Sequence, residues 1–141
     1  MTSQASSQTL RSIGAVFAGF VTVVALSLGT DQVLHATGVF PPWGRSMSDA
    51  LFLLATVYRT LYAVAGSYVT ARLAPRRPMA HAWIVGAVGL VLSGAGAIAT
   101  WDRDLGPRWY PLALVATALP CAWTGGRLRL VQLRGDQTLS A

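Results

Sequence analysis

Residues 82–100 read AWIVGAVGLVLSGAGAIAT and contain no charged side chain. The run is about as long as a helix must be to cross the hydrocarbon core of a bilayer, which takes roughly 20 apolar residues. Three more runs are similar: residues 12–30, residues 50–71, which only Arg59 interrupts with a charge, and residues 109–126. Backbone groups in lipid must be hydrogen-bonded internally, so each run should be helical. We therefore predict an all-α integral membrane protein, with four transmembrane helices in an antiparallel bundle and short loops.

The composition supports one membrane domain and no separate soluble domain. The chain has 141 residues, of which 53% are hydrophobic and only 11% are charged, whereas about 25% of residues are charged in typical soluble domains. We expect a single domain over residues 12–131, with helices at about 12–34, 50–73, 80–101 and 109–131. The polar segments 1–11 and 132–141 are expected to be flexible cytoplasmic tails.

The arginines predict the orientation in the membrane, because short cytoplasmic loops carry an excess of basic residues. All 11 basic residues are Arg. Seven fall on one side of the predicted bilayer: Arg11, Arg72, Arg76, Arg77, Arg127, Arg129 and Arg134. Three fall on the other side: Arg45, Arg103 and Arg108. Both termini are therefore expected in the cytoplasm. The absence of Lys and Asn, with abundant Ala, Gly and Arg, is typical of a GC-rich bacterial gene, which indicates a multi-pass protein of the bacterial inner membrane.

A cleaved signal peptide is the alternative interpretation of the first apolar run. The leader carries no positive charge before Arg11. The run is longer than the roughly 7–15 apolar residues of a signal peptide, and no clear small-x-small cleavage motif ends it. We expect the first helix to be retained.

Arg59 is the one charged residue inside a predicted span. An unpaired arginine inside the hydrocarbon core of a membrane costs a few kcal/mol. Asp31 and Asp102 close the first and third helices near the same level, so either could form a charge-assisted hydrogen bond with it. Tyr62 lies beside Arg59 on the same helix face. Two hypotheses follow for this polar group: a structural tie between helices, or a site for an anion or a lipid headgroup.

Small residues recur along the third span and predict a helix-packing face. Gly89, Ser93 and Ala97 are spaced four apart, and Gly86 belongs to a second such row. Small-xxx-small rows let helix backbones approach closely. The partner helix could belong to the same chain, to a second copy, or to another membrane protein. In the loop of residues 35–49, the apolar segment around Phe40 should fold back on the bundle or dip into the membrane interface, and a docking surface for a partner is the functional alternative.

Catalytic and metal-binding groups are sparse. The predicted topology places His35 and His81 on opposite sides of the membrane, so they cannot share a metal ion. Cys121 is the single cysteine, which we interpret as a small buried apolar residue. Ser93 has no His or Lys at membrane depth to act as its base. We therefore expect no catalytic, metal or cofactor site. The net charge of +6 lies at the ends of apolar spans, which favours contact with a lipid bilayer over nucleic acid.

Two hypotheses for function remain. The first is a non-enzymatic accessory or scaffold subunit that acts through helix–helix contacts, with a membrane protein or a second copy as partner. The second is a small transporter or an anion- or lipid-headgroup-binding protein that uses Arg59. An enzyme acting on lipids is a third alternative. The chain has no Glu, the residue that many small ion-coupled carriers place inside the membrane as a proton relay.

Overall fold

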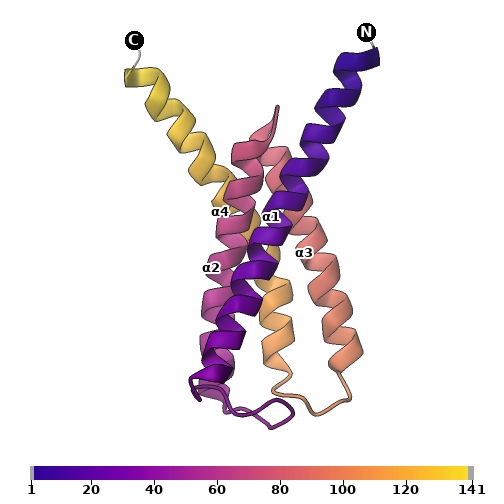
Figure 1. Ribbon diagram of the computed structural model, residues 1–141, viewed down its shortest axis with the longest axis vertical. Coiled ribbons are helices and arrows are strands. Elements are labelled where there is room, and N and C mark those ends of the chain that lie inside the picture. The colour runs from indigo at the N-terminus through magenta and orange to yellow at the C-terminus, as the bar shows by residue number, and fades with distance from the viewer. Residues whose placement is uncertain (1, 140–141) are drawn as a thin grey trace.

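The computed structural model of the chain describes residues 2–139 and shows an all-α fold (Figure 1). Four helices follow one another: α1 (Thr2–Ala36), α2 (Asp49–Leu73), α3 (Pro78–Thr100) and α4 (Trp109–Leu139). Ser6–Ala36 of α1, all of α2 and all of α3 are long and apolar enough to cross a membrane. The prediction of an all-α chain with four helices is confirmed.

α4 differs from the other three helices in composition. It contains Pro111 and Pro120, and its second half carries Arg127, Arg129 and Arg134. These residues lower its apolarity, which explains why α4 is not among the described helices that meet the length and composition expected of a membrane span. Pro120 lies inside a continuous helix, and its missing N–H leaves one backbone carbonyl of the preceding turn without its usual donor.

The first and last helices, α1 and α4, are longer than the sequence predicted. α1 begins at Thr2, so residues 2–11 are helical and do not form the expected flexible tail. α4 likewise continues to Leu139 through the second expected tail. Residues 2–11 contain no Gly or Pro, and a single Gly135 interrupts the end of α4. Polarity alone does not end a helix that meets no breaker. Residues 1, 140 and 141 of the predicted tails lie outside the described residues.

Helix boundaries follow local sequence signals. Ser48 precedes α2 in an extended conformation, and Asp49 places a negative charge in the first turn, where the helix dipole favours it. Pro78 begins α3, a position where its fixed φ suits the helix and its missing N–H costs nothing. In the loop between α1 and α2, Gly38 and Gly44 adopt φ of +74° and +85°, which side chains other than glycine rarely tolerate.

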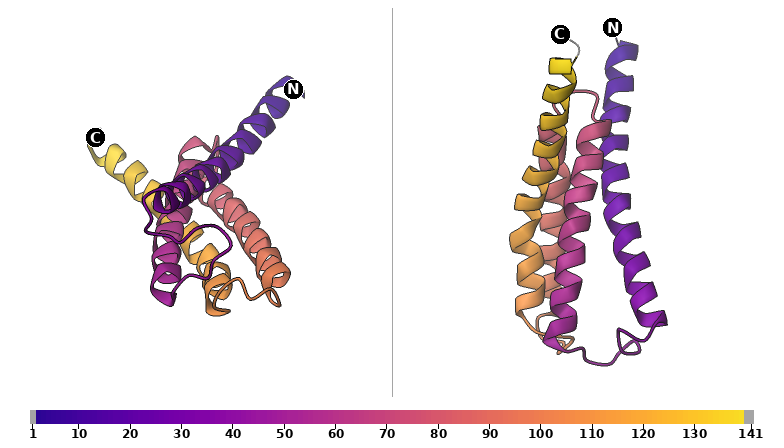
Figure 2. Two further views of the ribbon diagram at one scale, coloured as in Figure 1. Left: turned by 60° about the horizontal axis from the view of Figure 1, so that its bottom comes forward. Right: turned by 90° about the vertical axis from the view of Figure 1, so that its left-hand side faces the viewer.

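The helices run antiparallel, so both described ends of the chain lie at the same end of the molecule (Figure 1). α2 packs against each of the other three helices, and α3 and α4 pack together. α1 packs mainly on α2, touches α3 only slightly, and makes no contact with α4 within the described residues. Figure 2 shows the consequence: the first turns of α1 and the last turns of α4 diverge from the bundle in different directions.

Small residues allow the helix backbones to approach closely. At the α1–α2 crossing, a Cβ on Gly19 would collide with Oγ1 of Thr70 and lie 2.5 Å from the carbonyl oxygen of Gly66. At the α2–α4 crossing, a Cβ on Gly125 would lie 2.5 Å from the carbonyl oxygen of Val64. These contacts leave no room for a side chain, so glycine is required at both crossings.

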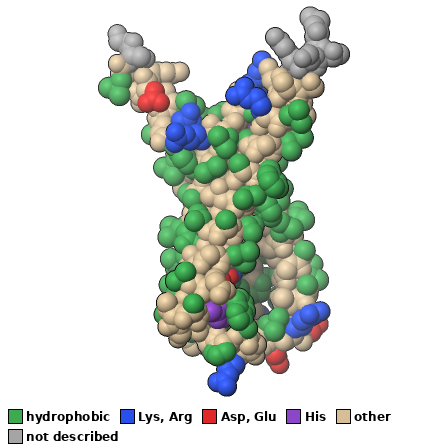
Figure 3. All heavy atoms as spheres, viewed as in Figure 1, with side chains coloured by type: hydrophobic (Ala, Val, Ile, Leu, Met, Phe, Trp, Pro, Cys, Tyr) green, Lys and Arg blue, Asp and Glu red, His purple; other side chains and the backbone are tan. Residues whose placement is uncertain are grey.

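The distribution of side-chain size is inverted relative to a soluble bundle. Ala82 and Ala122 are fully buried, whereas Ile98 is 81% exposed and Val91 is 69% exposed. Large apolar side chains cover much of the outer surface in the space-filling view (Figure 3). An exterior of this kind suits a lipid environment, where close packing of small residues holds helices together.

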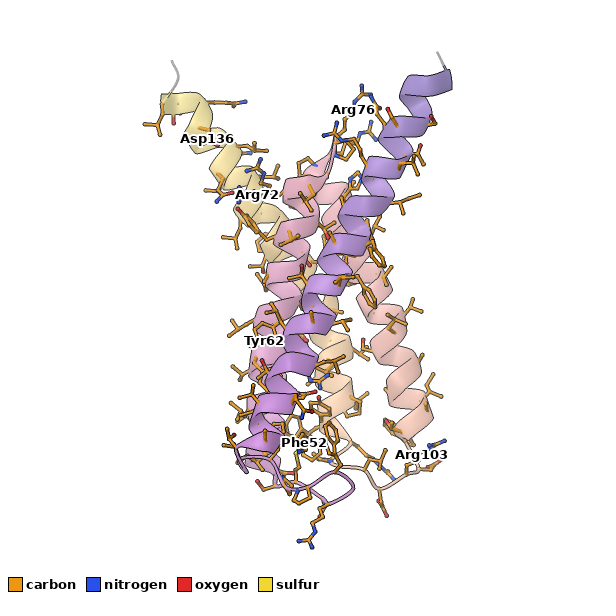
Figure 4. The ribbon with its side chains drawn as sticks, viewed as in Figure 1. Phe52, Tyr62, Arg72, Arg76, Arg103 and Asp136 are labelled. Atoms are coloured by element: carbon orange, nitrogen blue, oxygen red, sulfur yellow. The ribbon has the colours of Figure 1, made fainter. Side chains whose placement is uncertain are left out.

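The net charge of +6 is carried entirely by one end of the molecule. Seven arginines and Asp136 lie at the end that holds both termini, whereas three arginines and three aspartates balance at the opposite end, and Arg59 is balanced by Asp31. Figure 4 shows Arg72, Arg76 and Asp136 at the first end and Arg103 at the other. The grouping of arginines that the sequence predicted is therefore present in the fold.

The close α1–α2 crossing gives a testable expectation. Gly19→Ala should destabilise the protein by about 1–3 kcal/mol, because the added methyl group meets Thr70 and the backbone of Gly66. Gly14→Ala is the matched control, since it lies on the same helix with open space around the position of its Cβ. Thermal unfolding in detergent micelles, followed by circular dichroism, measures the difference. Equal melting temperatures for the two variants would contradict the crossing.

Candidate functional site

Asp31 of α1 binds two consecutive side chains of α2. Nη2 of Arg59 donates to Oδ2 of Asp31 at 2.5 Å, and the hydroxyl of Tyr58 donates to Oδ1 of the same carboxylate. Asp31 is only 8% exposed, so its charge is nearly removed from solvent. Both carboxylate oxygens thus have a donor, which is the condition under which burying a carboxylate is tolerated.

A third hydrogen bond between α1 and α2 lies one residue away along α1. The hydroxyls of Thr30 and Tyr62 are 2.8 Å apart. Tyr62 lies one helical turn after Tyr58, and the ring centroids of the two tyrosines are 5.8 Å apart. Figure 4 shows Tyr62 near the middle of α2, between Phe52 and Arg72. Together these bonds fix α1 on α2 with polar contacts at two successive levels. We call the residues Thr30, Asp31, Tyr58, Arg59 and Tyr62 the polar tie.

The structure separates Asp102 from the polar tie. Of the two carboxylates that the sequence allowed as partners of Arg59, Asp31 forms the ion pair, whereas Asp102 is exposed in the turn that follows α3. Figure 1 shows the reason: the end of α3 that leads into this turn stands apart from α1. Tyr62, the fourth predicted residue of this group, belongs to the tie through Thr30.

The sequence reasoning missed Tyr58 and Thr30. Tyr58 immediately precedes Arg59, and Thr30 immediately precedes Asp31, so adjacency to the charged residues was the available signal. Helical Thr hydroxyls often bond to their own backbone, as Thr56 does with the carbonyl of Phe52. Thr30 instead bonds across helices, and only the helix pairing reveals that choice.

The loop between α1 and α2 covers the polar tie on the side away from the chain termini. Phe40 is 3% exposed and packs in a buried cluster with Ala55 and Tyr58. Nδ1 of His35 lies 2.8 Å from the carbonyl oxygen of Pro41, and its ring stacks on Trp43 with centroids 3.8 Å apart. The expectation that this loop folds back on the bundle is confirmed.

Two cavities meet at Arg59. The first, of about 270 Å³, lies among α2, α3, α4 and the loop of residues 101–108. The second, of about 360 Å³, is lined by all four helices. Arg59, Ser93 and Leu114 line both cavities. The space-filling view shows the hollow between the helices at the end opposite the termini (Figure 3).

Arg59 retains hydrogen-bonding capacity toward the cavities. Its guanidinium has five N–H donors, and the ion pair with Asp31 uses Nη2. Nε is buried without a partner among the described residues, while 32% of the side chain is exposed. The wall of the first cavity also contains Arg108 and Asp104, so guanidinium groups outnumber carboxylates there. Asp31 balances the charge of Arg59, and the guanidinium donors that Asp31 leaves unused can bond to an anion.

The small residues predicted as a packing face on α3, Gly86, Gly89, Ser93 and Ala97, all line one or both cavities. Gly86 packs against Ala122 of α4, and Ala97 is 6% exposed. A Cβ on Gly89 would meet nothing within 4 Å, because Gly89 lines the second cavity. Ser93 lines both cavities, and its hydroxyl donates to the carbonyl of Gly89 at 2.7 Å. This face therefore bounds the cavities along its length, and it also packs closely on α4 at Gly86.

Metal-ligating side chains do not gather elsewhere. Within the described residues, no group of three or more His, Cys, Asp or Glu side chains is placed to hold a metal ion. Cys121 is a free, buried thiol on α4.

Comparison with known proteins adds no analogy: no protein-family model matches the chain, and no similar curated protein or solved structure was found.

The ion pair predicts energetic coupling between two helices. Arg59→Ala and Asp31→Ala should each destabilise the protein by about 1–3 kcal/mol, because each leaves a buried partner unsatisfied. The double variant should lose less than the sum, with a coupling energy of about 0.5–3 kcal/mol. Asp102→Ala is the control, since its effect should add to that of Arg59→Ala within about 0.5 kcal/mol. Unfolding of the wild-type protein, the three single variants and the two double variants in detergent micelles is the measurement, and additivity of the Asp31 and Arg59 changes would contradict the tie.

Proposed function

We propose that the protein is an integral membrane protein whose four helices cross the bilayer. Three helices are long and apolar enough, large apolar side chains face outward, and small residues form the interior. α4 lies between α2 and α3 in the bundle and packs against both, so it spans the same thickness as its neighbours. Its prolines and arginines are compatible with a span whose apolar part ends before Arg127.

The charge distribution supports an orientation. The end that carries both termini holds all of the net positive charge, and such an end faces the cytoplasm in proteins that follow the positive-inside rule. The Arg-rich composition without Lys or Asn supports a bacterial inner membrane as the location. In the proposed orientation, the loops of residues 37–48 and 101–108 lie on the outer side of the membrane.

The orientation predicts the behaviour of reporter fusions. A reporter that is active only in the periplasm should stay inactive when fused after Ala141, and should become active when fused within the loop around Arg103. The expectation follows from the seven arginines at one end. Expression of each fusion in a bacterial host and comparison of reporter activity provide the measurement. Activity of the fusion after Ala141 would require the inverted topology.

With this membrane topology, we propose that the protein binds a small anionic ligand inside the membrane and that Arg59 is the cation that binds it. One observation carries the proposal: the guanidinium lines two adjoining cavities while only one nitrogen is used by Asp31. A charged side chain inside a membrane is costly and commonly functional. Arg108 in the same cavity wall adds a second cation near the outer surface.

The scaffold hypothesis receives less support from the same geometry. A scaffold requires an exposed helix-packing face, whereas Gly86 is occupied by Ala122 of the same chain. A tie that served only to join α1 to α2 would not require a cavity on either side of Arg59. Binding therefore accounts for the polar tie and the cavities together, and a scaffold role accounts for the tie alone.

Arg59→Lys separates ligand binding from folding. Lysine keeps the positive charge beside Asp31 but lacks the planar fork of donors, so the protein should fold while its affinity for butyl phosphate falls about tenfold, equivalent to about 1.4 kcal/mol. Arg45→Lys, in the exposed outer loop, should leave the affinity unchanged. Calorimetric titration of butyl phosphate into the protein in zwitterionic micelles is the measurement. Unchanged affinity of a folded Arg59→Lys protein would refute the proposed role.

A further inference from the structure

The two cavities differ in chemical character, and this difference points to the class of ligand. We propose that the ligand is an anionic amphiphile with a single hydrocarbon chain, whose head binds Arg59 in the first cavity and whose chain fills the second. The inference rests on the proposed anion site at Arg59 and adds a binding place for the ligand's hydrocarbon chain. Lipid-derived phosphates and carboxylates with one chain belong to this class.

The first cavity suits the head. Its wall contains Arg59, Arg108 and Tyr110, together with the outer loop that follows α3. Arg108 lies over the ring of Trp101, with its guanidinium carbon 5.5 Å from the ring centroid, which holds the cation at the mouth. A phosphate or carboxylate in this cavity meets guanidinium donors from α2 and from the outer loop, and such charge-assisted hydrogen bonds are the strong ones.

The second cavity suits the chain. Its wall includes Phe20, Val23, Val85 and Leu92. Three hydroxyls in the same wall are satisfied by their own helices: Thr60 donates to the carbonyl of Thr56, Ser67 to that of Ala63, and Thr117 of α4 to that of Ala113. The wall therefore offers a hydrocarbon chain contact surface without leaving those donors unsatisfied.

The volumes favour one chain. The cavities of about 270 and 360 Å³ together fall within the roughly 300–1,000 Å³ of typical ligand pockets. A methylene group takes up nearly as much space as a water molecule in the liquid, roughly 30 Å³. At this size the second cavity has room for one chain of about a dozen carbons.

The weak contact between α1 and α3 provides a lateral entrance from the bilayer. These helices touch only slightly, and α1 does not contact α4 within residues 2–139. Phe20 and Val24 of α1 face Gly89 and Leu92 of α3 across the second cavity. An amphiphile already in the membrane can thus enter between α1 and α3 while its chain stays in the lipid phase.

Three glycines of α3 provide a matched set of variants. A Cβ on Gly89, Gly94 or Gly96 would meet nothing within 4 Å, so leucine begins in open space at each. Gly89 lines only the second cavity, Gly96 lines only the first, and Gly94 lines neither. Gly89→Leu should therefore block the chain, Gly96→Leu should block the head, and Gly94→Leu should serve as the control.

The experiment is native mass spectrometry of the full chain released from zwitterionic nanodiscs, with dodecyl phosphate, dodecanol and butyl phosphate as probes. The wild-type protein and Gly94→Leu should bind one dodecyl phosphate. Gly89→Leu should weaken that binding about tenfold or more and leave butyl phosphate unaffected, whereas Gly96→Leu should weaken both. Val24→Phe, which narrows the second cavity from α1, should reproduce the effect of Gly89→Leu if the latter does not fold.

The outcomes separate the inference from the proposed function. Full dodecyl phosphate binding by folded Gly89→Leu and Val24→Phe would overturn the chain site, while sensitivity of butyl phosphate to Arg59→Lys would still support the anion site. Dodecanol that binds as well as dodecyl phosphate would overturn the requirement for an anionic head. Absence of binding by every probe to the wild-type protein would overturn both proposals.

Discussion

The contact of Asp31 with Arg59 and Tyr58 is the constraint on which the arrangement of the helices depends. A buried carboxylate and a partly buried guanidinium tolerate the loss of water only while they remain paired, so α1 must lie on the face of α2 that presents both Tyr58 and Arg59. Once α1 occupies that face, α3 and α4 pack on the remaining surface of α2. The ion pair thus fixes which face of α2 meets α1, and α2 contacts all three other helices.

Glycine and alanine supply the second constraint, because they determine how near the helices come to one another away from the polar tie. Gly19 and Gly66 bring α1 onto α2, and Gly125 brings α4 onto α2. No such contact joins Gly89 to another helix, and the second cavity opens there. α1 and α4 are thus tight against α2 at these glycines, whereas the bundle is open at the two cavities beside the charged pair. Close packing and cavity formation are two results of where the small residues fall.

The sequence predicted the helices well because long apolar runs have few alternatives to helical structure. It did not predict their true ends, since residues 2–11 are polar yet contain no helix breaker. It left the partner of Arg59 open between Asp31 and Asp102, because both lie near the same level along the bundle axis, and axial position does not determine which helices are neighbours. Thr30 and Tyr58 were missed for the same reason: a hydroxyl on a helix reveals its partner only when the facing helix is known. The cavities depend on lateral packing and have no signature in hydropathy.

The polar tie and the proposed ligand site share one guanidinium, and this sharing links ligand occupancy to the position of α1. α1 is held to the bundle mainly through α2, so its attachment depends on the bonds to Asp31 and Thr30 and on the glycine crossing. An anion that bonds to the free nitrogens of Arg59 leaves the bond from Nη2 to Asp31 in place. An anion that draws Nη2 away leaves Asp31 with Tyr58 as its donor and weakens the hold on α1 at that level. If binding of the anion shifts the equilibrium between attached and detached α1 by some factor, then detachment of α1 changes the affinity of Arg59 for the anion by that same factor. The entrance between α1 and α3 would widen with that movement, so the geometry that admits the ligand and the bond that retains it act on the same helix.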